Sequence, residues 1–398
     1  MQEQPLDGVK VLELGSLIAG PFAGRLFGDF GAEVIKVEPP KVGDPLRKWR
    51  LLKDGTSLWW FVQSRNKKCI TLNLRSKEGS EIIKKLAREV DIIIENFKPG
   101  TLEKWGIGYE DLKKINPEII MVRISGYGQY GPYSAKPGFG SIGEAMGGIR
   151  YLSGYPDLPP VRTGISIGDS ISAVYAVMSA MMALYHRDIK GGEGQYIDVA
   201  LYEAIFSMME SMVPEFDYFN YIRERTGSTL PGIAPSNIYL CKDGKYVVIG
   251  ANGDSIFKRL CEAMDREDLA SNEEFASNDG RAKHMKYLDG QIEEWTKTMS
   301  IEDALKVLDE YQIPAGKIYS VEDMFSDPHF KAREMIKSVE IDDTQKLKVP
   351  GIIPKFSKTP GTIKWAGLKL GQSNQEIYRD MLGFSDDEIK QMEEEGII

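Results

Sequence analysis

The sequence predicts an α/β protein, with an open, mostly parallel sheet and flanking helices followed by a smaller α+β domain. Short apolar segments alternate with helical patterns over the first ~200 residues, an order typical of βαβ units. The pattern then changes to a polar passage containing Gly and Pro, and afterwards to a hairpin and several helices. The chain has 398 residues, enough for two or three domains of roughly 100–200 residues each.

The large domain opens with a strand, a tight loop and a helix. Residues 10–14 alternate in polarity, and Pro21 suits the first turn of a helix that ends near Asp29. The spacing of Ile82, Ile83 and Leu86 predicts another helix within 78–90. Apolar runs predict the remaining strands at 33–38, 69–74, 91–95 and 119–124.

The later segments predict a long helix and then the small domain. Residues 171–185 are the longest apolar run, and we expect a buried helix because a bilayer span needs about 18–20 such residues. A Met-rich helix follows from Leu201, and the pattern alone leaves the tail open to either domain. The small domain is expected to contain strands at 237–241 and 246–249 and helices near 257–264, 280–298 and 301–311. The assigned boundaries are 1–210 for the large domain, 211–235 for a linker, 236–325 for the small α+β domain, and 326–398 for a linker and return segment that completes the large domain.

Composition narrows the class of protein. Apolar residues make up 42% and charged residues 27%, which excludes disordered, collagen-like and disulfide-scaffold classes. The net charge of −9 without a block of like charge does not favour nucleic-acid binding. Cys69, Cys241 and Cys261 show no zinc-ligand spacing, so no metal site is predicted. With no signal- or transit-peptide pattern at the N-terminus, we expect a cytoplasmic protein without membrane contact.

Two short motifs suggest chemistry that their surroundings do not favour. Gly126 to Gly131 fits G-x-G-x-x-G, but Pro132 and Pro137 occupy the place of the phosphate-binding helix. Gly164 to Gly168 fits the G-x-S-x-G pattern of a serine hydrolase, with Ser166 as nucleophile. Such a serine needs a histidine base, and the three histidines are His186, His284 and His329. The last two leave the hydrolase open as an alternative.

Asp169 begins the long apolar helix and has two interpretations. An aspartate there serves as an N-cap, because its carboxylate accepts a backbone N–H bond. The residues alone favour this role, and the alternative is a carboxylate nucleophile beside Gly168, which lets a bulky substrate approach the backbone. The two roles are compatible.

A series of motifs along the whole chain resembles the class III CoA-transferase family, which includes formyl-CoA transferase and the carnitine-type CoA-transferases. Their order along the chain is the family's order. The motifs are Leu6 to Leu12, Ala19-Gly20-Pro21, Gly31 to Glu38, Gly43-Asp44, Arg47, Asn66-Lys67, Glu95-Asn96-Phe97, Gly106, Gly126-Tyr127-Gly128, Gly168-Asp169, Gly192 to Gln195 and Pro314-Ala315-Gly316.

The resemblance implies that Asp169 is the catalytic nucleophile of an enzyme that moves CoA from an acyl-CoA to a free carboxylic acid. Aspartyl anhydride and aspartyl-CoA thioester intermediates would form on it. Succinyl-CoA or acetyl-CoA is the expected donor, and no permanently bound cofactor is expected because CoA is part of the substrate. The resemblance also implies an interlocked homodimer.

The resemblance further assigns binding residues in the large domain. Arg47 and Trp49 fall near the active site of formyl-CoA transferase, with packing as the alternative role, and Trp59 falls where that enzyme has an aromatic residue. The expected CoA contacts are Leu72, Asn73, Leu74, Arg75, Asn96, Phe97, Lys98, Lys104 and Lys136, and the expected substrate-pocket residues are Ile18, Arg47, Trp49, Phe139 and Gly140.

Departures from formyl-CoA transferase make formyl and oxalate poor candidates for the substrates. Ile18 replaces an active-site glutamine, Gly140 replaces an acidic residue, and the mobile tetraglycine loop is absent. The first loop is closer to the carnitine-type branch. The alternatives are a carnitine-type transferase, a 2-methylacyl-CoA racemase and a non-catalytic acyl-CoA-binding protein. The racemase needs a histidine where this chain has Phe139, which cannot transfer a proton.

Overall fold

The computed structural model describes residues 3–398, which divide into two compact units. The first unit comprises the chain up to Arg150, Thr163–Asn220 and Lys331–Ile398, and the second comprises Tyr151–Arg162 and Tyr221–Phe330. The segment Tyr151–Arg162 therefore lies in the second unit, whereas the sequence places it in the large domain.

A six-stranded parallel sheet is the centre of the first unit, in the order β5-β2-β1-β6-β7-β8. This confirms the α/β class and the predicted parallel sheet. The strands are β1 (Lys10–Glu13), β2 (Glu33–Glu38), β5 (Lys67–Thr71), β6 (Ile92–Glu95), β7 (Ile120–Ser125) and β8 (Tyr196–Ala200).

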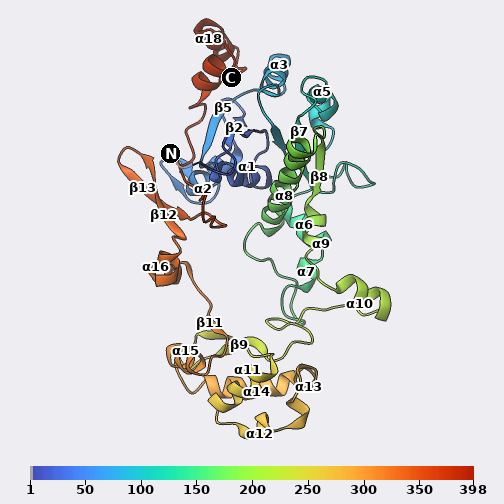
Figure 1. The fold of residues 1–398 in the computed structure, drawn as a ribbon, viewed down its shortest axis with the longest axis vertical. Helices are drawn as coiled ribbons and strands as arrows, with labels where there is room; N and C mark the ends of the chain where they lie inside the picture. Colours follow the sequence, from blue (N-terminus) through green and yellow to red (C-terminus); the bar gives the residue numbers. More distant parts are fainter. Residues whose placement is uncertain (1–2) are drawn as a thin grey trace. The chain divides into compact units, whose positions relative to one another are not determined.

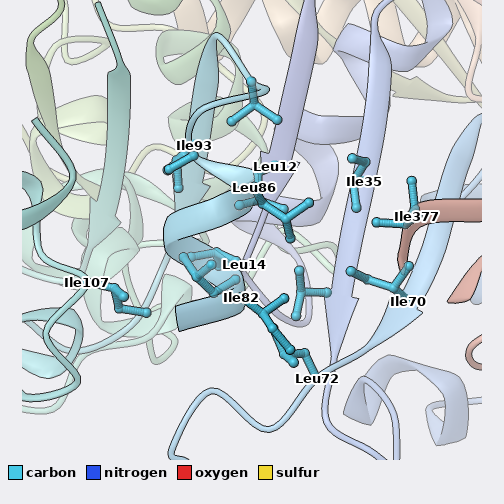
Figure 2. Close-up of a cluster of buried hydrophobic side chains, with 14 of the residues drawn as sticks. Leu12, Leu14, Ile35, Ile70, Leu72, Ile82, Leu86, Ile93, Ile107 and Ile377 are labelled. Atoms are coloured by element: carbon cyan, nitrogen blue, oxygen red, sulfur yellow. The ribbon is translucent and has the colours of Figure 1, made fainter. Parts of the chain in front are cut away.

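Helices cover both faces of this sheet. Alternate residues of each strand point to opposite faces, so each strand contributes side chains to two apolar clusters. Leu12 and Ile93 belong to one apolar cluster, with Ile82 and Leu86 of helix α3 (Lys77–Leu86) and with Ile377 near the C-terminus, as Figure 2 shows. Neighbouring strand residues belong to a second cluster, with side chains of helices α1 (Ala19–Asp29) and α8 (Ile167–Lys190).

Helix α8 is longer than the predicted apolar run and only one face of it is buried. Ala173, Ala176 and Ala180 lie against the sheet cluster, whereas Met182 and Tyr185 are exposed. The predicted buried helix is therefore buried on one face only in the single chain. Among residues 3–398, α8 is the one helix long and apolar enough to cross a membrane by length and composition, and one of its faces packs in the core of the first unit.

The C-terminal segment returns to the first unit. Asn73 donates its backbone N–H to the carbonyl of Ile397 at 2.7 Å, and the Tyr378 hydroxyl donates to the carbonyl of Thr71 at 2.6 Å. The red C-terminal segment accordingly lies beside α3 and β5 in Figure 1. Its elements are the hairpin β12 (Ile336–Asp342) and β13 (Gln345–Pro350), a π-helical segment Gln375–Met381, and α18 (Asp386–Glu394).

The second unit contains a three-stranded antiparallel sheet in the order β11-β10-β9, packed against helices through its own apolar core. The predicted hairpin is present, but the predicted helix 280–298 is two helices that meet at His284. Its elements are β9 (Ser236–Leu240), β10 (Tyr246–Gly250), β11 (Ala315–Lys317), α11 (Asp254–Ala263), α12 (Glu267–Ala270), α13 (Asn278–Lys283), α14 (Met285–Thr296), α15 (Ile301–Glu310) and α16 (Val321–Ser326), with α17 (Pro328–Ala332) at the boundary between the units.

Short elements complete the first unit, and the predicted Met-rich helix from Leu201 is interrupted after Phe206. They are β3 (Leu52–Lys53), β4 (Thr56–Ser57), α2 (Leu58–Gln63), α4 (Thr101–Lys104), α5 (Tyr109–Lys113), α6 (Gly140–Met146), α7 (Ile149–Leu152), which reaches the unit boundary, α9 (Leu201–Phe206) and α10 (Met212–Phe219).

Candidate active site

A cleft of about 540 Å³ lies at the carboxyl ends of the sheet strands. The strand order reverses direction between β1 and β6, and ligands of such sheets bind outside the carboxyl ends of the strands at this reversal. The loops that follow β1, β2, β5 and β6 all contribute to its walls. Its lining includes Gly15, Ser16, Lys36, Lys41, Asp44, Leu72, Asn73, Leu74, Arg75, Phe97 and Trp105.

The loop after β1 is fixed by side chains from neighbouring loops. Asn96 accepts a hydrogen bond from the Ser16 N–H at 2.8 Å and donates one to the Ser16 carbonyl at 2.9 Å. Both carboxylate oxygens of Asp44 accept from the Leu17 N–H, at 3.1 and 3.2 Å. Leu17 has φ 65°, a region that non-glycine residues rarely adopt, so these contacts hold a strained loop against the cleft.

Buried charges lie directly beneath this loop. Lys36 is 1% exposed and pairs with Asp44 at 2.8 Å and with Glu13 at 3.1 Å. Burial disfavours the charge of Lys36, but the two carboxylates outweigh it and hold its pKa above the usual value. Burial also opposes ionisation of Asp44, yet Lys36 and backbone N–H donors hold its pKa below the usual value.

Glu95 ends β6 immediately before the cleft residues Asn96 and Phe97. Its carboxylate accepts from Arg123 Nε at 2.8 Å and from the Phe97 N–H at 2.7 Å. Burial raises the pKa of Glu95 to about 7, and the Arg123 contact opposes this rise.

Asp169 lies at the same edge of the sheet as the cleft. Helix α8 connects the parallel strands β7 and β8 and therefore runs antiparallel to them, so its first turn is at their carboxyl ends. Asp169 is the third residue of α8 and Ser166 occupies the N-cap position. The predicted N-cap role of Asp169 is wrong because the helix begins three residues earlier than an N-cap at Asp169 requires.

The Asp169 carboxylate lies against Gly140, the first residue of α6. A Cβ atom built on Gly140 would lie 2.0 Å from Oδ2 of Asp169 and 2.7 Å from its Cγ. A Cβ atom built on Gly168 would lie 2.9 Å from the Gly140 carbonyl oxygen. Glycines at these two positions allow α6 and the start of α8 to approach closely. Figure 1 shows α6 and α9 beside this end of α8.

The cleft includes about half of the CoA contacts expected from the sequence. Leu72 to Arg75 and Phe97 line it, and Asn96 fixes its first loop. Lys98 and Lys104 are exposed and do not line the cleft, and Lys136 lies over the ring of Tyr133 at 3.7 Å. Contact of these three lysines with CoA stays a prediction.

The expected substrate-pocket residues occupy different environments. Arg47 is bound within the fold: two of its nitrogens donate to Glu38 at 2.7 Å, and its guanidinium lies 3.7 Å from the centre of the Trp60 ring. These contacts favour the packing alternative for Arg47. Ile18 is buried at the start of α1, whereas Trp49 and Phe139 are exposed.

Ser166 has no base among the histidines of the first unit. His186 lies 20 residues along the same helix, roughly 30 Å away at 1.5 Å per residue. The other two histidines, His284 and His329, belong to the second unit. The G-x-G-x-x-G segment, for its part, is followed by a loop until α6 begins at Gly140, which confirms that the phosphate-binding helix is missing.

Sequence patterns missed several residues around the site. Ser16, Lys41 and Trp105 line the cleft, and Glu144 is buried beneath the first turn of α8. Ser16 and Lys41 could have been found from their positions shortly after predicted strands, because the carboxyl ends of parallel strands carry ligand sites. Within residues 3–398, no group of three or more His, Cys, Asp or Glu side chains could hold a metal ion.

Comparison with known proteins defines the class to which this fold and cleft belong. The family described as CoA-transferase family III matches residues 6–374, and the chain belongs to this family. The sequence resemblance is thereby confirmed, and the protein is a CoA-transferase.

Individual relatives are similar over nearly their whole lengths. The chain is 50% identical over 396 residues to succinyl-CoA–D-citramalate CoA-transferase of Chloroflexus aurantiacus, covering 99% of this chain and 98% of the relative. It is 32% identical over 396 residues to human succinyl-CoA:glutarate CoA-transferase, covering 99% and 90%. A crystal structure of a CAIB/BAIF family protein from Brucella suis matches with a TM-score of 0.83 and 35% identity, covering 95% of this chain and all of that one.

Proposed function

We propose that this enzyme transfers CoA from succinyl-CoA to a dicarboxylic acid of four or five carbons, such as citramalate, malate or glutarate, with Asp169 as the nucleophile. The position of the Asp169 carboxylate, at the same sheet edge as the cleft and against a glycine, carries the proposal. Succinyl-CoA is favoured as the donor because relatives named for D-citramalate, L-malate and glutarate all carry succinyl-CoA or succinate in their names.

The proposed reaction uses two acyl exchanges on Asp169. A carboxylate oxygen attacks the thioester carbonyl of succinyl-CoA, the C–S bond breaks, and an aspartyl–succinyl anhydride and CoA thiolate form. The thiolate then attacks the aspartyl carbonyl of the anhydride, which releases succinate and leaves an aspartyl-CoA thioester.

The acceptor carboxylate completes the cycle. It attacks the aspartyl thioester, expels the thiolate and forms a second anhydride. The thiolate attacks the acceptor carbonyl of that anhydride, which yields the new acyl-CoA and restores the Asp169 carboxylate. No proton or electron is consumed overall.

The cleft supplies groups suited to the CoA part of the donor. Arg75 is exposed at its wall and can pair with phosphate groups through its guanidinium. Phe97 and Trp105 present apolar surface within it, and their rings are 5.4 Å apart in an edge-to-face arrangement.

The test is a substrate panel. Purified enzyme is mixed with succinyl-CoA and D-citramalate, L-malate, glutarate, oxalate or carnitine, and the new acyl-CoA is identified by mass spectrometry. We expect a new acyl-CoA with D-citramalate, L-malate or glutarate. Products only with oxalate or carnitine, or release of free CoA without an acceptor, would contradict the proposal.

We also propose that the enzyme is a homodimer. The outer face of α8 and the helix α10 expose apolar side chains, among them Met182 and Phe219, which are 61% and 73% exposed in the single chain. Light scattering at micromolar concentration tests this, and a monomeric mass would contradict it.

A further inference from the structure

The first turn of α8 lacks the usual cap for its backbone donors. The first N–H groups of a helix have no partner within it, and an N-cap serine normally accepts one of them. Ser166 occupies the N-cap position but makes no side-chain cap bond. The helix that carries Asp169 must therefore be held at its start by another group.

Glu144 of α6 provides that group. Its Oε1 accepts from the Gly168 N–H at 3.4 Å, a long bond, and its side chain is 1% exposed. A Cβ built on Gly168 would lie 3.2 Å from Cγ of Glu144. The buried carboxylate is thus packed against the residue that precedes Asp169.

Arg150 fixes the other oxygen of this carboxylate. Its Nη2 and Nε lie 3.0 and 3.2 Å from Oε2 of Glu144. The pair compensates the Glu144 charge, which would otherwise be costly to bury.

Helix α6 itself has little freedom to shift. A Cβ built on Gly143 would lie 2.7 Å from Cβ of Leu201, and one built on Gly147 would lie 2.6 Å from Cβ of Ile205. The helix is therefore in close contact with α9 through Gly143 and its C-cap Gly147, and with α8 through Gly140 and Glu144.

We infer that Glu144, held by Arg150, is a positioning residue that fixes the first turn of α8 and so aims the Asp169 carboxylate. This rests on the proposed function, in which Asp169 is the nucleophile. Small displacements of a reacting group can cost about 100-fold in rate, so the effect should appear in the acylation step. Donor affinity depends on the cleft and should remain unchanged.

The experiment measures how fast succinyl-CoA forms a covalent adduct on the protein, with quenched samples analysed by mass spectrometry. The variants are Glu144→Gln, which keeps an acceptor oxygen, Glu144→Leu, which removes it, and Arg150→Met. We expect adduct formation at least tenfold slower in Glu144→Leu, with intermediate rates in the other two. KM for succinyl-CoA should stay within about twofold, as a misaimed nucleophile affects the chemical step.

Two controls separate this inference from the proposed function and from general damage. Asp29→Asn removes the carboxylate of another buried ion pair, in which Arg65 donates to Asp29 at 2.8 and 2.6 Å. This variant should lower the stability of the protein without slowing adduct formation. Asp169→Asn should form no adduct, and an adduct in it would refute the proposed function itself.

The inference is overturned if folded Glu144→Gln and Arg150→Met form the adduct at the wild-type rate while Asp169→Asn forms none. It is equally overturned if KM rises in proportion to the loss of rate. Should Glu144→Leu fail to fold, the other two variants decide.

Discussion

Asp169 and Gly140 are in direct contact across two helices: the Asp169 carboxylate occupies the space in which Gly140 would need a side chain. The Asp169 carboxylate fits in this position because Gly140 has no Cβ atom. Any larger residue at position 140 must move either the Asp169 side chain or one of the two helices.

Gly140→Ala should accordingly reduce turnover strongly. Its Cβ would lie 2.0 Å from Asp169 Oδ2, so we expect a loss of about 10- to 100-fold in kcat and a destabilisation of about 1–3 kcal/mol from overpacking. Steady-state kinetics and thermal unfolding measure both. The matched control is Gly290→Ala, in the interior of α14 with open space around it, which should leave kcat unchanged.

Arg75→Met should weaken binding of the CoA donor without affecting chemistry. Losing one charge-assisted hydrogen bond costs about 1.5–3 kcal/mol, so KM for succinyl-CoA should rise roughly 10- to 100-fold. Lys77→Met, two residues away and outside the cleft lining, is the control. Similar KM values for Arg75→Met and wild type would show that CoA does not occupy this cleft.

The same assay tests the lysines that the family resemblance assigns to CoA. We keep the expectation that Lys98→Met and Lys104→Met raise KM for the donor. Because neither lysine lines the cleft, their effects should be smaller than that of Arg75→Met. An unchanged KM in both would remove them from the CoA site.

Glu95→Gln should remove part of the pH dependence of stability. The Glu95 pKa is about 7 in the fold, against an ordinary value of 4.5, so the folded state binds a proton that the unfolded state does not between these values. The contribution is fully present below about pH 4.5 and is lost as the pH rises through about 7, with a slope of up to about 1.4 kcal/mol per pH unit.

Denaturant unfolding from pH 5 to 8 checks this, as the wild type should lose stability relative to Glu95→Gln on going from pH 5 to pH 7. Glu103→Gln is the control: burial opposes ionisation of Glu103, but its contact with Arg123 holds the pKa below the usual value, so it should not remove this slope. A difference between wild type and Glu95→Gln that stays constant with pH would contradict the assignment.

Asp44→Asn should destabilise the fold and weaken donor binding together. It breaks the buried pair with Lys36 and removes the charged acceptor for the Leu17 N–H, and breaking such a pair costs about 3–5 kcal/mol. Asp54→Asn, whose ion pair with Lys53 is exposed, should cost less than about 1 kcal/mol. Equal unfolding free energies for the two variants would show that the buried network is not important.

The sheet could be predicted because its strands are short apolar runs between helical patterns. The start of β5 was missed because Lys67 and Lys68 begin it. Lys67 is buried because Glu13 pairs with it at 2.6 Å and the Pro21 carbonyl accepts from it at 2.7 Å. A buried lysine has no distinguishing pattern in the sequence when its partner lies on another strand.

The site was predicted less completely than the fold. Asp169 follows from the Gly168-Asp169 motif, whereas the segment from Leu72 to Arg75 follows from the family resemblance alone. The role of Asp169 stays a proposal. The Glu144 contact with Gly168 joins residues 24 positions apart, and α6 contains two glycines among its seven residues and a third directly after it, which hides its helical pattern. Contacts of this kind depend on how helices pack and therefore could not be predicted from the sequence.

The most direct test is to mix the enzyme with succinyl-CoA, measure the intact protein mass, and map any adduct by peptide analysis, alongside Asp169→Asn and Ser166→Ala. We expect a succinyl or CoA adduct on the side-chain carboxylate of Asp169 in the wild type and in Ser166→Ala, and no adduct in Asp169→Asn. An adduct on Ser166, or undiminished CoA transfer by Asp169→Asn, would contradict this expectation.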